Sequence, residues 1–161
     1  PLAEAGINIR YHDQMILKPS DWDAMPIFRK CLDTRVSILK MHPGITPQIV
    51  REILCSRDTR AVIIETYGAG NAPTKEWFLD IVREADAMGK IILNLTQCIA
   101  GSVNMDIYAT GKCLKDAGVI SGYDSTTESA LAKLFYLMGV FPDNATVKDL
   151  LKLNLRGEIS K

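Results

Sequence analysis

Residues 61–97 read AVIIETYGAGNAPTKEWFLDIVREADAMGKIILNLTQ, and this stretch decides the fold. Its first four residues are apolar, as in a strand that is covered on both faces, so a strand is predicted over 61–68. A second such strand is predicted over 90–97. Between them, residues 74–89 carry apolar side chains at helical spacing, namely Trp77, Phe78, Ile81, Val82 and Ala85. A strand, a helix and a strand in this order indicate two parallel strands joined by a right-handed crossover.

The same alternation continues on both sides of this stretch. Strands are predicted over 36–41 and 119–122, and helices over 46–56, 105–118, 125–139 and 146–157. The expected helix caps are Thr46, Thr74 and either Ser125 or Thr126, and basic residues are expected in the final turn of the last helix. The sequence therefore predicts a doubly wound α/β domain over 36–161, with a four-stranded parallel sheet between flanking helices in a Rossmann-like or flavodoxin-like three-layer arrangement. Residues 1–35 fit this pattern less well and are interpreted as a partial strand and a connector from an interdomain region.

The carboxyl edge of such a sheet is where ligands bind, and four loops leave it. These loops are 42–44, 67–73, 96–104 and 122–128. The loop 67–73 (YGAGNAP) holds two glycines, an asparagine and a proline, more special backbone than a plain turn requires. It is neither a GxGxxG motif nor a phosphate-binding loop with a lysine, so it gives no support to nucleotide binding.

Composition excludes several classes of function. The 19 basic and 19 acidic residues give a formal net charge of +0, so no nucleic-acid partner is expected. The absence of a long apolar run predicts no membrane span. Four cysteines without CxxC spacing and only two histidines predict no metal site, and no cofactor is expected. Ser102, His42 and Asp124 form a hydrolytic triad only on paper, because no GxSxG motif is present.

Four motifs in order resemble the C-terminal half of type I (cytoplasmic) L-asparaginases. They are YGAGNAP (67–73), NLTQCIAGSVNMDIYATG (94–111), GVISGYDSTTESALAKLFYLMG (118–139) and NLRGE (154–158). The resemblance implies a cytoplasmic enzyme that hydrolyses L-asparagine to L-aspartate and ammonia. It also implies a homodimer or homotetramer whose active sites lie between subunits.

The catalytic half of that family is not found in this chain. The family's nucleophilic threonine lies in a Thr-Gly-Gly motif, and no such motif occurs here. We therefore expect no catalytic residue in this chain and no activity from it alone. Its partner would be the N-terminal catalytic domain of the same or a neighbouring subunit.

The resemblance implies a set of residues that bind the substrate of a neighbouring subunit. These are Asn71, Asn104, Asp106 and Tyr108, with Asn71 offering its amide to the α-amino or the α-carboxylate group. Some bacterial type I enzymes also bind asparagine at an intersubunit allosteric site, which involves an arginine and a cysteine. Here Glu65 stands where the arginine is expected, while Cys98 is present, so allosteric binding in that form is not expected.

Two further readings stay open. One is an asparaginase-like subunit of a tRNA-dependent amidotransferase, against which the zero net charge argues. The other is a non-catalytic regulatory or assembly domain that binds a small amino acid. An animal homologue with ankyrin repeats beyond Lys161 is also compatible with the sequence.

Overall fold

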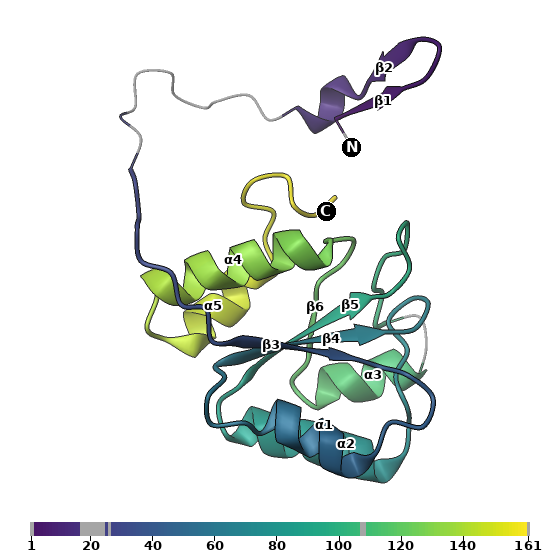
Figure 1. The fold of residues 1–161 in the computed structure, drawn as a ribbon, viewed down its shortest axis with the longest axis vertical. Coiled ribbons are helices and arrows are strands. Elements are labelled where there is room, and N and C mark those ends of the chain that lie inside the picture. Colours follow the sequence, from purple (N-terminus) through teal and green to yellow (C-terminus); the bar gives the residue numbers. More distant parts are fainter. Residues whose placement is uncertain (1, 17–24, 26, 107–108, 161) are drawn as a thin grey trace.

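The computed structural model describes residues 2–16, 25, 27–106 and 109–160 of the chain. Its central feature is a parallel sheet with the strand order β3-β4-β5-β6 (Figure 1). The strands are β3 (Val36–Lys40), β4 (Ala61–Thr66), β5 (Ile91–Thr96) and β6 (Ile120–Ser121). All three pairings between neighbours are parallel, so the strand ends that precede the loops lie along one edge. The predicted four-stranded α/β fold is confirmed.

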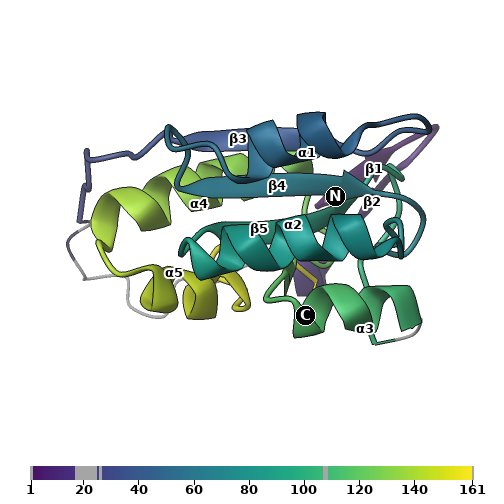
Figure 2. The ribbon, with the colours of Figure 1, turned by 90° about the horizontal axis from the view of Figure 1, so that it is seen from below.

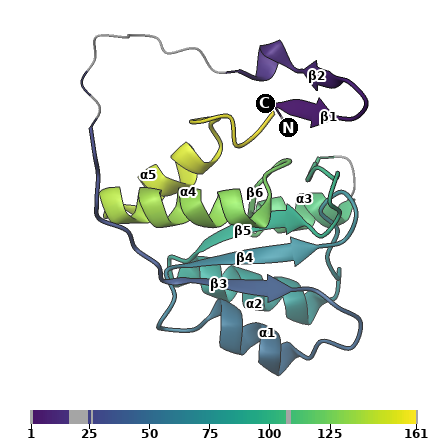
Figure 3. The same cartoon turned by 45° about the horizontal axis from the view of Figure 1, so that its top comes forward.

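Helices cover both faces of this sheet. The crossover helices α1 (Pro47–Leu54), α2 (Glu76–Ala87) and α3 (Ala109–Asp116) share one face, and α4 (Thr127–Val140) and α5 (Asn144–Leu151) cover the other (Figures 2 and 3). The strands have the same order in space as in sequence, so the right-handed crossovers that join them all lie on one face of the sheet. The layers are thus as expected, but the second layer comes from helices after the last strand and not from a reversal of the strand order.

The core consists of two apolar layers separated by the sheet. Along β4, Val62 and Ile64 contact the α1–α3 layer, while Ala61 and Ile63 contact the α4–α5 layer. All four side chains are fully buried. This two-sided burial explains why the strand reads as a continuous apolar run.

The N-terminal residues form a separate hairpin, which the views of Figures 1 and 3 show apart from the large sheet. Strand β1 (Ala3–Ala5) pairs antiparallel with β2 (Ile9–Tyr11), and a 3-10 turn, η1 (Asp13–Met15), follows. The apolar residues of the two strands share one face, and Ile9 and Tyr11 remain exposed at 60% and 63%. Further on, the backbone at Cys31 lies against α4, where a Cβ atom on Gly139 would fall 2.2 Å from the carbonyl oxygen of Cys31.

Several predicted helix ends differ from the observed ones. Helix α2 begins at Glu76 after Lys75, so Thr74 is not its cap. In α3, residues 107–108 lie outside the described part, and the described helix starts at Ala109. The last helix runs over Asn144–Leu151 instead of 146–157, because Asp143 caps it by accepting hydrogen bonds from two backbone N–H groups. Thr46 and Thr126 are caps as predicted.

The residues after α5 fold back as a clasp on α4. The Nζ atom of Lys133 lies 2.6 Å from a carboxylate oxygen of Glu158, and their side chains are 8% and 11% exposed. The Glu158 carboxylate also accepts backbone hydrogen bonds from Leu155 and Arg156. Burial raises the pKa of Glu158, but these hydrogen bonds outweigh burial and lower it to about 2.

We predict that Glu158→Gln lowers the free energy of unfolding by about 3 kcal/mol at pH 6, because it leaves the Lys133 charge buried without its partner. A carboxyl group whose pKa is lowered by folding stabilises above its unfolded pKa, and this contribution is lost as the pH falls through the folded pKa. The difference in unfolding free energy between wild type and variant should therefore shrink as the pH falls from 4.5, the ordinary pKa of a glutamate, towards about 2. Urea unfolding of both proteins at several pH values measures it, and a difference that is constant down to pH 2 would contradict the clasp.

Candidate functional site

The loop after β4 is a turn that closes on itself. Tyr67 and Asn71 form a β-bridge in which each backbone N–H group donates to the carbonyl of the other, at 2.9 and 2.8 Å. Gly68 and Gly70 adopt positive φ angles of 51° and 101°, which side chains strongly disfavour. The glycines thus allow the chain to reverse within five residues and to return Asn71 to the strand end.

A buried polar network fixes this turn to the sheet. The side chain of Asn94 on β5 is fully buried and donates from Nδ2 to the carbonyl oxygen of Gly70 at 3.1 Å. Its Oδ1 atom accepts the hydroxyl hydrogen bond of Thr66 on β4 at 2.7 Å. Both ends of the Asn94 amide are therefore satisfied inside the core, as buried polar groups require. The carbonyl of Gly70 is held by a side chain that cannot move without breaking this network.

Residues Val103 and Asn104 join this turn to the loop after β6. The N–H group of Val103 donates to the carbonyl of Tyr123 at 2.8 Å, and that of Asn104 donates to the carbonyl of Ala69 at 3.1 Å. Tyr123 has a φ angle of 55° and is the one non-glycine residue with a positive φ in the described part of the chain. Such backbone is unfavourable for a tyrosine and persists because its surroundings hold it.

The side chain of Asn71 lies at the junction of the turn with α3. Its Oδ1 atom is 2.6 Å from the hydroxyl oxygen of Thr110, which is in the first turn of α3. Both residues are half-buried. Tyr108, which the resemblance implies as a further substrate contact, lies outside the described residues.

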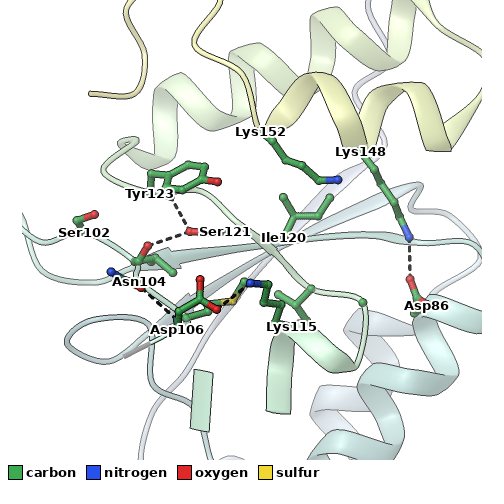
Figure 4. A pocket seen from close by; sticks show the side chains of 14 residues that line it. Asp86, Ser102, Asn104, Asp106, Lys115, Ile120, Ser121, Tyr123, Lys148 and Lys152 are labelled. Carbon is green, nitrogen blue, oxygen red and sulfur yellow. Dashed lines mark hydrogen bonds and ion pairs between the residues drawn. The ribbon is translucent and has the colours of Figure 1, made fainter. Parts of the chain in front are cut away.

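The two weaker sequence candidates lie at the mouth of a groove along the β6 edge (Figure 4). Asn104 accepts a hydrogen bond from the backbone of Asp106 at 3.1 Å, and Asp106 forms an ion pair with Lys115 at 2.7 Å. Both candidates are exposed. The groove of about 670 Å³ continues between α3 and α5, where Lys148 pairs with Asp86 at 2.7 Å.

Glu65 and Cys98 occupy different environments at the same edge. The Glu65 side chain is 13% exposed, accepts a hydrogen bond from the Thr127 hydroxyl at 2.7 Å and lies 3.5 Å from the Lys40 ammonium group. Cys98 is exposed in the loop after β5. The carboxylate of Glu65 is thus held by groups of the chain itself, at the first turn of α4.

The candidate triad of Ser102, His42 and Asp124 is not assembled. His42 Nδ1 lies 3.1 Å from the carbonyl oxygen of Pro43, and the Asp124 carboxylate accepts the N–H group of Ser160 at 2.9 Å. Within the described ranges, no group of three or more His, Cys, Asp or Glu residues is arranged to hold a metal ion. Among the helices that the structure describes, none combines the length and apolar character needed to cross a membrane.

Sequence reasoning missed three residues that shape this site, namely Thr66, Asn94 and Thr110. Asn94 had a detectable signal, because it is the one amide within the otherwise apolar run 91–95. A polar residue in a strand covered on both faces needs a buried partner. Thr110 had no such signal, since a threonine in the first turn of a helix is ordinary.

Comparisons with known proteins agree with the motifs. The family model described as the glutaminase/asparaginase C-terminal domain matches residues 35–151. L-asparaginase 1 of Escherichia coli K12 is 39% identical over 160 residues, which are 99% of this chain and 46% of that protein. The crystal structure of L-asparaginase I from Vibrio cholerae superposes with a TM-score of 0.87 at 40% identity, covering 100% of this chain and 48% of the other.

Relatives with other names share the same region. The human 60 kDa lysophospholipase is 39% identical over 161 residues, which are 99% of this chain and 28% of that protein. Subunits D of archaeal glutamyl-tRNA(Gln) amidotransferases also match. The chain thus spans about half the length of the two asparaginases and a smaller share of these relatives.

We predict that Gly70→Ala disrupts the contact between the two loops. An added Cβ atom would lie 2.7 Å from Cγ1 of Val103, in addition to the cost of the positive φ. Gly44→Ala is the matched control, because Gly44 has a φ of 85° but nothing within 4 Å of its Cβ position. Chemical unfolding should show Gly70→Ala to be less stable than Gly44→Ala by about 1–3 kcal/mol. Equal losses would mean that the packing of Val103 on Gly70 is loose.

Proposed function

This chain belongs to the glutaminase/asparaginase C-terminal domain family, and we propose that it completes the substrate pocket of an L-asparaginase. The reaction is the hydrolysis of L-asparagine to L-aspartate and ammonia. The observation that carries the proposal is the rigid turn 67–71, which holds the half-buried Asn71 amide at the carboxyl edge of the sheet. The resemblance of the motifs to type I L-asparaginases is confirmed by the family model and the two asparaginase matches.

The chemistry of bond cleavage belongs to the rest of the protein. The sequence holds no Thr-Gly-Gly motif, so the nucleophile and the groups that activate it are proposed to come from an N-terminal domain. The asparaginases matched here are about twice as long as this chain, which leaves room for such a domain. We propose that the edge of this domain faces the active site of a neighbouring subunit, in a homodimer or homotetramer, and that the enzyme is cytoplasmic.

The proposed contribution of this domain is to orient the substrate and to exclude water. A group that is held before the substrate arrives costs little further entropy when it binds, so rigid loops favour a reactive alignment. Asn71 is the main contact, because its backbone and its side chain are both anchored. Asn104 and Asp106 are proposed to act at the rim, since both are exposed, and Tyr108 is proposed as a further contact on the resemblance alone.

Two alternatives have weaker support. An amidotransferase subunit is compatible with the archaeal relatives, but a formal net charge of +0 offers little attraction for a tRNA. A regulatory domain that binds a small amino acid by itself needs an enclosed pocket on this chain. The Asn71 side chain lies instead at the carboxyl edge of the sheet and does not line the groove along β6, which favours a pocket shared with another polypeptide.

We expect the 161-residue chain alone to release no ammonia from L-asparagine, because it holds no nucleophile of the family type. The full-length protein should release ammonia, and Asn71→Ala in that protein should lower kcat/KM by about tenfold or more. A coupled assay of ammonia release measures all three. An active 161-residue chain, verified by mass, would overturn the assignment of the nucleophile to the other half.

A second expectation concerns regulation. Glu65 is a carboxylate already bound by Lys40 and Thr127, so it repels a second carboxylate and does not hold asparagine at an allosteric site. The rate of the full-length enzyme should rise hyperbolically with the concentration of L-asparagine. A sigmoidal curve that Glu65→Gln makes hyperbolic would show that Glu65 takes part in allosteric binding after all.

A further inference from the structure

We infer that Thr110 is a positioning residue, whose hydroxyl group turns the Asn71 amide so that Asn71 binds the α-carboxylate of the substrate and not its α-ammonium group. This inference rests on the proposed function, because it assigns a partner to Asn71 within the proposed pocket. It adds the direction of the hydrogen bond, which the sequence leaves open.

The first step is which atom of the Asn71 amide faces Thr110. The two atoms in contact are 2.6 Å apart. Hydrogen bonds between two oxygens are commonly about 2.7 Å long, whereas those from a nitrogen are commonly about 2.9 Å. The short distance therefore fits a hydroxyl group that donates to the amide oxygen, and it fits an amide nitrogen less well.

The second step is which hydrogen-bonding group of the Asn71 side chain remains for a ligand. Within the described residues, the Nδ2 atom of Asn71 has no hydrogen-bond partner. This nitrogen would lie 3.8 Å from a Cβ atom added at Gly68, so a side chain at position 68 would contact it. The backbone of Asn71 is fixed by its bridge to Tyr67, and the hydrogen bond from Thr110 holds its side-chain amide. Asn71 thus keeps two N–H donors at the carboxyl edge of the sheet that no described residue takes.

The third step is the charge that suits this position. An amide NH2 group and an ammonium group both donate hydrogen bonds, so they do not bond to each other. A carboxylate accepts hydrogen bonds, so it can bind the amide NH2 group. Thr110 is the second residue of α3 (Ala109–Asp116), whose N-terminal end carries partial positive charge. The donor and the helix end therefore favour the same ligand class, a carboxylate.

The test uses the full-length enzyme and three substrates. L-asparagine carries both groups, succinamic acid lacks the ammonium, and L-aspartic diamide replaces the α-carboxylate with a neutral amide. Thr110→Val should lower kcat/KM by about tenfold for L-asparagine and for succinamic acid, mainly through KM, but little for the diamide. Thr110→Ser keeps the hydroxyl group and should restore the wild-type values. Adding Thr110→Val to Asn71→Ala should cause little further loss, because both changes remove the same contact.

A matched control separates orientation from general stability. Thr146 is in the first turn of α5 and donates its hydroxyl hydrogen bond to Asp143 at 2.7 Å, away from this edge. Thr146→Val should leave the ratio of kcat/KM values between the three substrates unchanged. Equal losses for all three substrates with Thr110→Val would reduce Thr110 to a structural role. A loss with L-asparagine that disappears with succinamic acid would show that Asn71 faces the ammonium group. Either result overturns the inference.

A binding measurement decides the inference if the full-length protein proves inactive on L-asparagine. Calorimetry then compares L-aspartate with L-aspartic diamide. Binding of L-aspartate that Thr110→Val weakens and Thr110→Ser preserves would support the inference while the proposed reaction fails. Absent binding, or binding that Thr110→Val leaves unchanged, would overturn it.

Discussion

The buried side chain of Asn94 is the interaction on which the carboxyl edge of the sheet depends. It lies fully buried in the sheet core, yet its amide bonds to Thr66 on the neighbouring strand and to the backbone of the turn at Gly70. An amide that lost either partner would be left unsatisfied in the core, at a cost of about 1–3 kcal/mol. The strands and the turn are thus held as one unit. Because Asn71 belongs to this turn, the sheet also fixes the position of Asn71.

The opposite edge of the sheet shows a different use of polar groups. There the largely buried Arg60 forms an ion pair with Asp33 and donates to backbone carbonyls at the end of α4, namely those of Met138, Phe141 and Pro142. These bonds satisfy carbonyls that a helix end leaves without partners. The Arg60 guanidinium is bonded to groups of the chain itself, so this edge links Asp33 to the end of α4. At the carboxyl edge, by contrast, the Asn71 amide keeps donors that no described residue takes.

Periodicity in the sequence was enough to predict the strands, the layers and the edge that carries the loops, because burial on two faces leaves a strong pattern in a parallel sheet. Helix ends were less predictable, since Lys75 precedes α2 without a side-chain cap and Asp143 takes a capping role that no apolar pattern marks. Asn71 was proposed from its motif, but its partner Thr110 was not. Thr110 is 39 residues away in sequence, and only the folded chain brings the two together.

The central claim is that this edge forms part of a substrate pocket shared with another polypeptide. The most direct measurement is a crystal structure of the full-length protein with L-aspartate bound. The account predicts that one carboxylate of L-aspartate lies within hydrogen-bond distance of Asn71 Nδ2, and that the remaining contacts come from the catalytic half of a neighbouring subunit. An L-aspartate enclosed only by residues outside this domain, with Asn71 facing solvent, would contradict it.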